Sequence, residues 1–477
     1  MKSELLDIYI STLYNISKQE KARIYLVGGA VRDFFLKKDI NDYDFVIFGN
    51  TDSVVEKFVK QFNCKFIKYE KKLVTYRIFC RLKTIDITNP RGKSIEEDLS
   101  RRDFTINSIA YDFENDKIID PQNGIKDIKR KTIRINFKDS FKDDPVRILR
   151  TFRLASLFRF DISAKTLKIA QNSVELLNLV SKERITEELR KFFGLNNTFT
   201  YLLLMDRVGV IDTLFEDLSL TNGCIQSEHH LFDVKTHSLN VYNFIEWSHN
   251  RLYRILGKCY KKYSSHITDN HNVVMSSMKL AALFHDAGKP FSKFVDDSNR
   301  VHFPKHEQKS AELFVKYAKI YSFGNNITKL TKFFIEKHIE PSYMFSMWSK
   351  KKLKEIIVVD FFLDYKEYGI DLLFFALADT LAKGKISANN REIYIDFLKK
   401  MAQFFYHKIK PRLKEKTLID GNYILENFPC IDKKNIKFIL KEVKKAQILN
   451  IIKSKEDATL MVKELKTVGA AAKNDSR

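Results

Sequence analysis

The stretch YLVGGAVRDFFL, residues 25–36, decides the fold of the first part of the chain. The apolar run at 23–27 predicts a short buried strand that ends at Gly28 and Gly29, and a helical pattern follows it. Glycines let the main chain approach a ligand closely, and the free N–H groups at a helix start suit a phosphate. Arg32 in the first turn could then clamp a triphosphate, although a tight turn with a surface arginine explains the same residues.

The next predicted strand, DYDFVIFG at 42–49, carries two carboxylates. Asp42 and Asp44 are two residues apart, so both point to the same face of the strand. Paired carboxylates repel each other unless a cation neutralises them. Two Mg²⁺ ions would do so, one activating an attacking 3′-hydroxyl and the other holding a triphosphate. A solvated strand start is the alternative, and it suits Asp42 better than Asp44, which precedes the apolar run.

A third carboxylate, Asp86, lies in the strand pattern TIDIT at 84–88. Its neighbours are isoleucines that face the other side of the strand, and an acidic residue within an apolar strand is costly to bury without a partner. A metal site shared with Asp42 and Asp44 would supply that partner and make Asp86 catalytic. An edge strand with one wet face would also accommodate it, so both interpretations stay open.

The surrounding patterns complete a small mixed sheet followed by helices. Residues 1–20 and 51–63 have helical spacing, whereas 72–82 predicts one long strand or a strand pair. From about Asp139, amphipathic helices follow one another almost to the end of the sequence. We therefore expect an α+β fold with a small mixed-sheet head and a mostly α-helical remainder.

Composition and charge narrow the function. The 477 residues suggest two to four domains. A formal net charge of +23 usually indicates a polyanionic partner such as nucleic acid, although a Lys-rich proteome would produce the same excess. The N-terminal segment lacks a signal-peptide core, and no apolar run reaches the length of a membrane span. We expect a cytoplasmic protein with no membrane partner.

The five cysteines are scattered along the sequence at irregular intervals. They are Cys64, Cys80, Cys224, Cys259 and Cys430. No two of them stand at a metal-ligand spacing such as C-x-x-C. An odd number of scattered cysteines suggests reduced thiols in a cytosol.

Five motifs follow one another in a fixed order. They are GGAVRD at 28–33, DYDFV at 42–46, EEDLSRRDFTINSIAYD at 96–112, IDPQNGIKDIKRKTIR at 119–134 and DDPVRILRTFRLA at 143–155. Their order and spacing resemble the class II tRNA nucleotidyltransferase and bacterial poly(A) polymerase family, over residues 23 to about 200. The resemblance implies an enzyme that adds nucleotides to the 3′ end of tRNA without a template, using Mg²⁺.

The resemblance also assigns roles to individual residues. It implies that Asp42 and Asp44 are the metal ligands. The expected nucleotide contacts in the head are Gly28, Gly29, Arg32, Arg102 and Asn107. Ser108 departs from the family pattern, which usually has Ala there, and this difference looks harmless.

The helical segment after the head carries Asp144 and three arginines, Arg147, Arg150 and Arg153. The arginines are three residues apart and so share one side of a helix, where an ordinary charged face with an Asp–Arg i,i+3 pair would look the same. The family resemblance instead assigns these positions to nucleotide recognition. It expects Glu where this chain has Asp143, which puts the role of that residue in doubt.

A chemical logic connects Asp144 and Arg147 to the choice of base. Cytosine and adenine both present an exocyclic amino donor beside a ring-nitrogen acceptor. A fixed carboxylate would accept from the amino group, and a fixed guanidinium would donate to the ring nitrogen. Guanine and uracil present a carbonyl and a ring N–H instead, so buried polar groups would be left unpaired. CTP and ATP are therefore the expected substrates.

A second series of metal-ligand residues lies downstream. His237, the adjacent pair His285-Asp286 and the distant Asp379 resemble the HD phosphohydrolase superfamily, and His and Asp are apt ligands for a divalent transition metal that activates water. His306 and His338 fit the extra histidines of some HD domains. A domain that keeps this fold without its chemistry is the alternative. The Lys-rich last stretch resembles the tRNA-binding tail of the nucleotidyltransferase family.

These patterns predict four domains: the head 1–138, a helical neck 139–222 that binds nucleotide and RNA, an HD domain 223–395 and a tRNA-binding tail 396–477. Three functions compete. The leading one is tRNA 3′-end synthesis; the others are poly(A) polymerase activity and a phosphohydrolase in which the HD domain is the working part. SKERITEELRKFF at 181–193 resembles the tRNA enzymes more than the poly(A) polymerases.

The connection between Asp86 and Glu96 reads only DITNPRGKSIE. In members of the family that add CCA, a longer flexible loop usually stands in this region and helps the pocket to change from C to A. A short connection with Pro90 has little room to act as such a lever. The sequence therefore suggests addition of the two C residues alone, with a separate enzyme adding A, although short-loop members could switch through another element.

Overall fold

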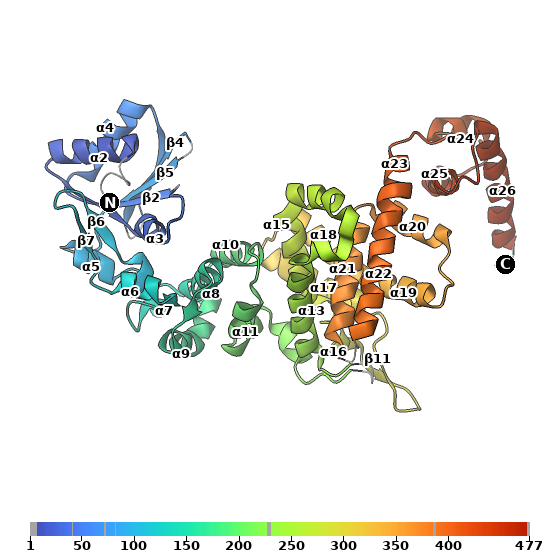
Figure 1. Ribbon diagram of the computed structural model, residues 1–477, viewed down its shortest axis with the longest axis horizontal. Coiled ribbons are helices and arrows are strands. Elements are labelled where there is room, and N and C mark those ends of the chain that lie inside the picture. Colours follow the sequence, from blue (N-terminus) through green and yellow to red (C-terminus); the bar gives the residue numbers. More distant parts are fainter. Residues whose placement is uncertain are drawn as a thin grey trace. The chain divides into compact units, whose positions relative to one another are not determined.

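The computed structural model describes residues 7–40, 42–70, 73–81, 83–226, 230–384 and 388–474 (Figure 1). Contacts divide the chain into two compact units, Met1–Leu214 and Phe215–Arg477. The predicted α+β class is confirmed, since an N-terminal mixed sheet precedes a mostly helical remainder. The four predicted domain boundaries stay predictions.

The first unit is built on a seven-stranded sheet in the order β3-β4-β5-β2-β1-β6-β7. The strands are β1 (Arg23–Val27), β2 (Asp42–Phe48), β3 (Lys65–Glu70), β4 (Val74–Cys80), β5 (Lys83–Thr88), β6 (Ala110–Asp112) and β7 (Lys117–Ile119). β2 and β5 are parallel, and the other neighbouring pairs are antiparallel. β2 is thus a central strand, which explains why its apolar run 45–47 is fully buried.

The pairing of β2 brings two of the predicted carboxylates together. Asp44 is paired with Val27 of β1 on one side and with Asp86 of β5 on the other. Side chains at paired positions of neighbouring strands stand on the same face of a sheet. Asp44 and Asp86 therefore share one face of the sheet, although they are far apart in the sequence.

The edge of the sheet differs from the sequence prediction. Residues 72–82 contain one strand, β4, and its partner is β3, which the sequence did not predict; residues 72 and 82 themselves lie outside the described part of the chain. Every residue of β3 is exposed, so it lacks the apolar alternation by which strands are found. The structure also joins Cys64 to Cys80, and the expectation of five free thiols is wrong for this pair. The β3–β4 register pairs Lys65 with Phe79, and its continuation by one residue sets the two cysteines opposite each other, which their sequence spacing does not show.

Helices surround and follow the sheet of the first unit. They are α2 (Ile8–Gln19), α3 (Gly29–Phe35), α4 (Thr51–Phe62), α5 (Ile95–Ser100), α6 (Gly124–Lys129), α7 (Ser140–Asp143), α8 (Arg147–Phe158), α9 (Ala164–Ser173), α10 (Lys182–Phe193), α11 (Phe199–Arg207) and α12 (Val210–Leu214), with the short strands β8 (Thr132–Ile133) and β9 (Asp161–Ile162). Of the predicted helix 1–20, residues 1–6 lie outside the described residues. α8 packs against α10 and buries Ile148, Phe152 and Ala155, so its charged side is left for the candidate site.

The second unit is helical apart from the hairpin of β10 (Phe294–Val295) and β11 (Val301–His302). Its helices are α13 (Val234–His249), α14 (Leu252–Leu256), α15 (Tyr260–Phe284), α16 (Lys289–Ser292), α17 (His306–Ile320), α18 (Asn325–Lys337), α19 (Glu340–Ser349), α20 (Glu355–Tyr365), α21 (Tyr368–Ala382), α22 (Ala388–Phe404), α23 (Lys410–Leu413), α24 (Gly421–Asn427), α25 (Lys433–Ile448) and α26 (Lys455–Asn474). α21 is buried along almost its whole length and packs against α13, while α24 to α26 share a small apolar core of their own. Within the described residues, no helix has the length and apolar character of a membrane span.

Candidate active sites

A cleft of about 400 Å³ in the first unit collects most of the residues that the sequence singled out. All nine predicted nucleotide contacts line it together with Asp44: Gly28, Gly29, Arg32, Arg102, Asn107, Asp144, Arg147, Arg150 and Arg153. Asp42, which is exposed, and Asp86 are not among the lining residues. The fold thus gathers residues of four separate sequence motifs at one cavity, although the roles of the residues stay predictions.

The turn between β1 and α3 permits a close approach of charged groups to the main chain. Gly28 has φ +71°, a left-handed conformation that side chains disfavour. A Cβ atom at this position would lie 3.0 Å from Oδ2 of Asp44 and 3.1 Å from a terminal guanidinium nitrogen of Arg102. Both the backbone angle and the space therefore require glycine here, as expected of a turn built for close contact.

Asp44 stands in the environment of a cation-binding carboxylate. Burial raises its pKa, and the neighbouring Asp86 raises it further, whereas Arg102 and a hydrogen bond from the Gly29 N–H lower it. A buried carboxylate beside a second one is stabilised in its charged form by a bound cation. These surroundings fit the predicted metal site.

Asp86 lies beside Asp44 but already has a partner. Its two oxygens accept from Nε and Nη2 of Arg77 at 2.8 and 2.6 Å, a bidentate ion pair from the neighbouring strand β4. The sequence anticipated that Asp86 needs a partner, and in this structure the partner is a guanidinium. A direct metal contact by Asp86 would have to use the lone pairs that Arg77 leaves free.

Asp144 and Arg147, the two residues predicted to recognise the base, are each held in place by a different residue. Oδ2 of Asp144 accepts from Arg184 at 2.7 Å, while its Oδ1 is buried and makes no hydrogen bond. Arg147 donates to Oγ and O of Ser140 at 2.9 and 3.3 Å. No ion pair links Asp144 to Arg147 among the described residues, so the ordinary i,i+3 pair does not form. Each group keeps polar capacity that a ligand could use.

The other two arginines of α8 are anchored by carboxylates behind them. Arg150 contacts Asp103 at 3.1 Å and Glu188 at 3.3 Å, and Arg153 contacts Glu188 at 2.5 Å. Burial acts to raise the pKa of Asp103, but Arg150 and a hydrogen bond from Asn107 hold that pKa below its usual value. Sequence reasoning missed Asp103, Glu188 and the cleft residue Arg91, because none of them stood out by periodicity or spacing.

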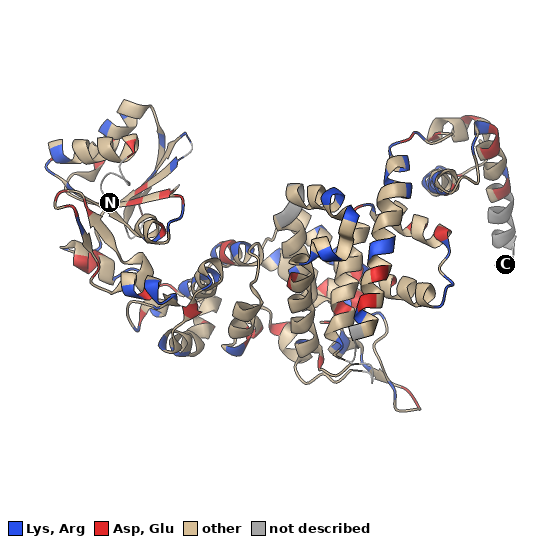
Figure 2. Cartoon of the chain, viewed as in Figure 1, with Lys and Arg blue, Asp and Glu red and all other residues tan. Residues whose placement is uncertain are grey.

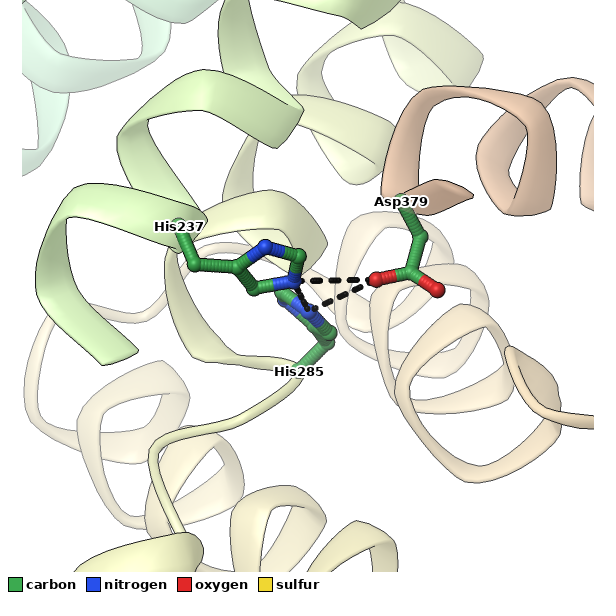
Figure 3. Close-up of side chains that lie close together, drawn as sticks. All are labelled: His237, His285 and Asp379. Atoms are coloured by element: carbon green, nitrogen blue, oxygen red, sulfur yellow. Dashed lines mark hydrogen bonds and ion pairs between the residues drawn. The ribbon is translucent and has the colours of Figure 1, made fainter. Parts of the chain in front are cut away.

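The second unit contains the metal-ligand cluster (Figure 3). Nε2 of His237, on α13, lies 3.0 Å from Oδ1 of Asp379, on α21, and 3.3 Å from Nε2 of His285. His285 follows the end of α15, and the packing of α13 against both α15 and α21 brings these residues together. One ligand atom of each of the three residues lies within 4.8 Å of the others, which is the arrangement a metal ion needs.

A second group overlaps the first one. His285, Asp286 and His338 also have ligand atoms within 4.8 Å of one another, and Nε2 of His306 lies 3.3 Å from Oδ1 of Asp286. The structure therefore brings together all six residues that the sequence named here. It adds Lys289, which donates to Asp286 at 2.6 Å.

Three of these histidines are oriented in the same way. Nδ1 of His285, His306 and His338 lies 3.0, 2.9 and 2.7 Å from the carbonyl oxygen of the residue three positions earlier. A histidine that donates Nδ1–H to a carbonyl has a lone pair on Nε2, which here faces the cluster. These hydrogen bonds thus orient the Nε2 atoms to bind a cation. This geometry supports a metal site independently of the sequence motif.

The electrostatics of the cluster also favour a bound cation. Burial acts to lower the pKa of His285, but Asp286 and Asp379 raise it to about 9. Burial and the neighbouring His285 lower the pKa of His338 to about 3, which keeps it neutral. The two carboxylates therefore stabilise a positive charge at the centre of the cluster, and a divalent cation satisfies the same requirement.

Comparison with known families gives three matches along the chain. Residues 24–94 and 89–134 match the "Poly A polymerase head domain", residues 159–220 match the "Probable RNA and SrmB- binding site of polymerase A", and residues 234–384 match the "HD domain". The predicted resemblance is confirmed by these matches.

Similar proteins share only part of the sequence. A CC-adding tRNA nucleotidyltransferase of Synechocystis is 31% identical over 206 residues, which are 42% of this chain and 50% of that protein. A CCA-adding enzyme of Buchnera aphidicola is 33% identical over 230 residues, 44% of this chain and 54% of the other. The chain thus matches about half the length of these relatives. A solved Thermotoga maritima CCA-adding enzyme, complexed with tRNA, has the same fold over 97% of both chains, with a TM-score of 0.63 and 22% identity.

Proposed function

We propose that this chain, which joins a poly A polymerase head domain to an HD domain, is a tRNA nucleotidyltransferase that adds C, or C and A, to the 3′ end of tRNA. The observation that carries the proposal is the cleft of the first unit, where acidic, basic and glycine residues of four motifs meet. The named relatives support the same activity, since they are CC-adding and CCA-adding enzymes. None of the three similar proteins described above is named a poly(A) polymerase, so this alternative is less favoured.

In the proposed reaction, the 3′-oxygen of tRNA attacks the α-phosphorus of the nucleotide and pyrophosphate leaves. Asp42 and Asp44 would hold Mg²⁺, which supplies positive charge at the reacting phosphate and favours deprotonation of the attacking hydroxyl. Gly28 and Gly29 leave room for the triphosphate beside Asp44. Arg102, whose guanidinium reaches the same turn, would neutralise phosphate charge.

The base would be chosen by Asp144 and Arg147. The free, buried Oδ1 of Asp144 suits an amino donor, because an unpaired buried acceptor is costly. Arg147 is held by the neutral acceptors of Ser140, so its charge is available to a ring nitrogen. Cytosine and adenine satisfy both groups, whereas guanine and uracil satisfy neither.

The tRNA would be held by cationic residues outside the cleft. α25 carries six lysines, Lys433, Lys434, Lys437, Lys441, Lys444 and Lys445, and Figure 2 shows basic residues on this helix. Part of this charge serves internal ion pairs, since Lys441 and Lys445 contact Asp360 of α20. Lys444 is buried and donates to O of Glu415, so the exposed Lys433, Lys434 and Lys437 remain available for phosphates.

The short connection after β5 bears on whether A is added. Its main chain is tied down: the N–H of Asn89 donates to O of Val74, that of Arg91 to Asp98 and that of Lys93 to Glu97. A segment fixed at three points within the five residues 89–93 is poorly suited to the movement that a change from C to A requires. This favours addition of CC, with a separate enzyme adding A afterwards.

The test is incubation of the purified protein with tRNA transcripts that end at the discriminator base, at C or at CC, with labelled CTP, ATP or both. Products that end in CC although ATP is present would support CC addition, and completion to CCA would exclude it. Long A tracts would identify a poly(A) polymerase. Failure to extend any transcript would contradict the proposed function itself.

A second activity, metal-dependent phosphoester hydrolysis, is favoured by the orientation of the three histidines in the HD domain. His237, His285, Asp286 and Asp379 would hold a divalent transition metal, which supplies Lewis acidity and lowers the pKa of bound water. His306 and His338 would complete a second position beside Asp286. Lys289 contributes a cation next to Asp286, where a substrate phosphate would need one.

A further inference from the structure

A pocket of the second unit lies outside both candidate sites. It has a volume of about 430 Å³ and is formed where the end of α13, the short helix α14 and the first turns of α15 meet. Pockets for small ligands have volumes of roughly 300–1,000 Å³, so this one is large enough for a ring system. No carboxylate, lysine or arginine is among its described lining residues. The pocket therefore suits an uncharged group.

Two tyrosines form one wall of this pocket. The rings of Tyr253 on α14 and Tyr260 on α15 have centroids 5.7 Å apart and planes at 83°, which is an edge-to-face contact. The Tyr253 side chain is nevertheless 74% exposed, so the protein leaves most of its ring uncovered. Leu252 and Ile267 also line the pocket and are buried, which makes its inner side apolar. An exposed ring beside an apolar surface offers a flat ligand a place to stack.

Two hydroxyl groups add acceptors to the same pocket. Ser264 and Thr268 follow Tyr260 at intervals of four residues and so share its face of α15. Oγ of Ser264 donates to O of Lys261 at 3.0 Å, and Oγ1 of Thr268 donates to O of Ser264 at 2.7 Å. Because both hydroxyl protons are engaged, the two oxygens can accept from a ligand. A nucleobase, with apolar faces and amino or ring N–H donors at its edge, matches this lining.

The charge around the pocket indicates what carries the base. Residues 247–268 contain no Asp or Glu and five exposed cations: Arg251, Arg254, Lys258, Lys261 and Lys262. Arg254 contacts Glu392 at 3.5 Å, but both side chains are exposed and water screens the pair. Lys258, Lys261 and Lys262 make no ion pair with any residue that the structure describes. This surface is therefore complementary to a polyanion.

The cations stand beside both tyrosines. Arg251 and Arg254 flank Tyr253 in the sequence of α14, and Lys261 and Lys262 follow Tyr260 at the start of α15. A free nucleotide carries its phosphate on one side of the base only, whereas a strand continues with phosphates on both sides. Cations on both walls therefore fit a strand better than a free nucleotide.

We propose that this pocket binds one unpaired base of an RNA strand, with the Tyr253 ring stacked on the base and the surrounding lysines and arginines at the phosphates. A base inside a double helix is covered on both faces, so only an unpaired base can enter. RNA is the expected nucleic acid, since residues 159–220 match an RNA-binding family model. The pocket shares no residue with the cleft or the HD cluster, and the inference does not depend on nucleotide addition.

The experiment maps the RNA contact on the full chain. A cytidine strand of about eight nucleotides with one central 5-iodocytidine is bound and irradiated, and the crosslinked peptides are identified by mass spectrometry. Crosslinks within residues 247–268 are expected, at Tyr253 or Tyr260. The strand concentration that gives half of the maximal crosslinking within these residues measures the affinity of this site alone. Crosslinks that all lie elsewhere would overturn the proposal.

Three variants test the stacking contact. Tyr253→Ala should raise the half-saturating concentration about tenfold, because the base loses its stacking partner, and Tyr253→Phe should stay within about twofold of the wild type. Tyr343→Ala is the matched control, since Tyr343 is a 67% exposed tyrosine of the same unit outside this pocket, and it should bind as the wild type does. Wild-type affinity in Tyr253→Ala would remove the base from this pocket.

Competition identifies the form of the ligand. An RNA duplex of the same length and free CMP should each displace the strand at least about tenfold less well than unlabelled strand does. Equal displacement by the duplex would show a general cationic surface, and equal displacement by CMP would show a site for free nucleotides; either result overturns the proposal. A protein that crosslinks here but adds no nucleotide to tRNA would contradict the proposed function and leave this inference standing.

Discussion

The two candidate sites use the same kinds of charged residue in opposite ways. In the cleft of the first unit, carboxylates such as Asp98 and Glu188 support arginines that face the cavity. In the HD cluster, lysine and main-chain carbonyls support the carboxylate and imidazole groups that face inward. The cleft therefore presents positive charge to an anionic ligand, and the cluster presents lone pairs to a cation.

The two sites also differ in how far their residues are exposed to solvent. His237, His285 and Asp286 are at most 1% exposed, whereas the side chain of Arg150 in the cleft is 33% exposed. A large nucleotide and an RNA end need an accessible surface, while a metal ion needs only a few ligand atoms at fixed distances. Mutation, salt and metal should therefore affect the two sites separately.

The largest effect is expected at the metal site of the head. Asp44→Asn should lower kcat for CTP addition by roughly 10³-fold or more, because the metal supplies several kcal/mol to the reaction. Folding should be kept, since the amide has the same shape and burial disfavours the charged carboxylate. The rate is measured with labelled CTP on a tRNA transcript, and the fold by circular dichroism.

Two variants make this measurement specific. Asp86→Asn should cost much less than Asp44→Asn, about tenfold, because Asp86 is engaged by Arg77. Glu56→Gln, on the exposed side of α4, should have no effect. A turnover equal to that of the wild type in Asp44→Asn would show that the metal-site assignment is wrong.

The second largest effect is expected at the HD cluster. His285→Ala should lower hydrolysis of a phosphomonoester or a cyclic nucleotide by more than about 100-fold, since loss of even an outer-sphere contact costs up to that much. Bound transition metal, measured by elemental analysis, should fall with it, while CTP addition stays at the wild-type rate.

His302→Ala is the matched histidine control, because the exposed His302 lies on β11 and contacts only Asp296 and the ring of Phe294 in the described contacts. Metal content unchanged in His285→Ala, or a wild-type protein without metal after growth in metal-replete medium, would contradict the proposed centre.

A moderate effect is expected on base choice. Asp144→Ala should reduce the preference for CTP over UTP by about 30-fold, or ~2 kcal/mol, because the amino group of cytosine loses its acceptor. Inhibition by pyrophosphate should change little, since the phosphates bind at the other end of the cleft. An unchanged preference would remove Asp144 from base recognition.

The smallest effect is expected from salt, and it compares the sites directly. When the salt concentration is quadrupled, kcat/KM for tRNA should fall roughly tenfold. This is the fall expected when the protein neutralises about two phosphates of the RNA. Hydrolysis of a small phosphoester at the buried HD cluster should change far less, because few phosphates are involved. A flat salt response of nucleotide addition would argue against an RNA substrate.

The sequence determined the features that depend on neighbouring residues. The Gly28–Gly29 turn, the strand with Asp42 and Asp44, and the arginine face of α8 were all predicted at or within one residue of their positions in the structure. Each of these rests on a short-range rule, such as the alternation of a strand or the period of a helix. Five ordered motifs then sufficed to indicate the family.

Tertiary structure alone decided which of these features meet and which partner each charge takes. The exposed edge strand β3, the Cys64–Cys80 pairing and the capture of Asp86 by Arg77 all follow from the order and register of strands. So does the place of Arg91 in the cleft, which depends on a hydrogen bond to Asp98 seven residues away. Register and long-range pairing depend on contacts between residues far apart in the chain, and no local pattern encodes them.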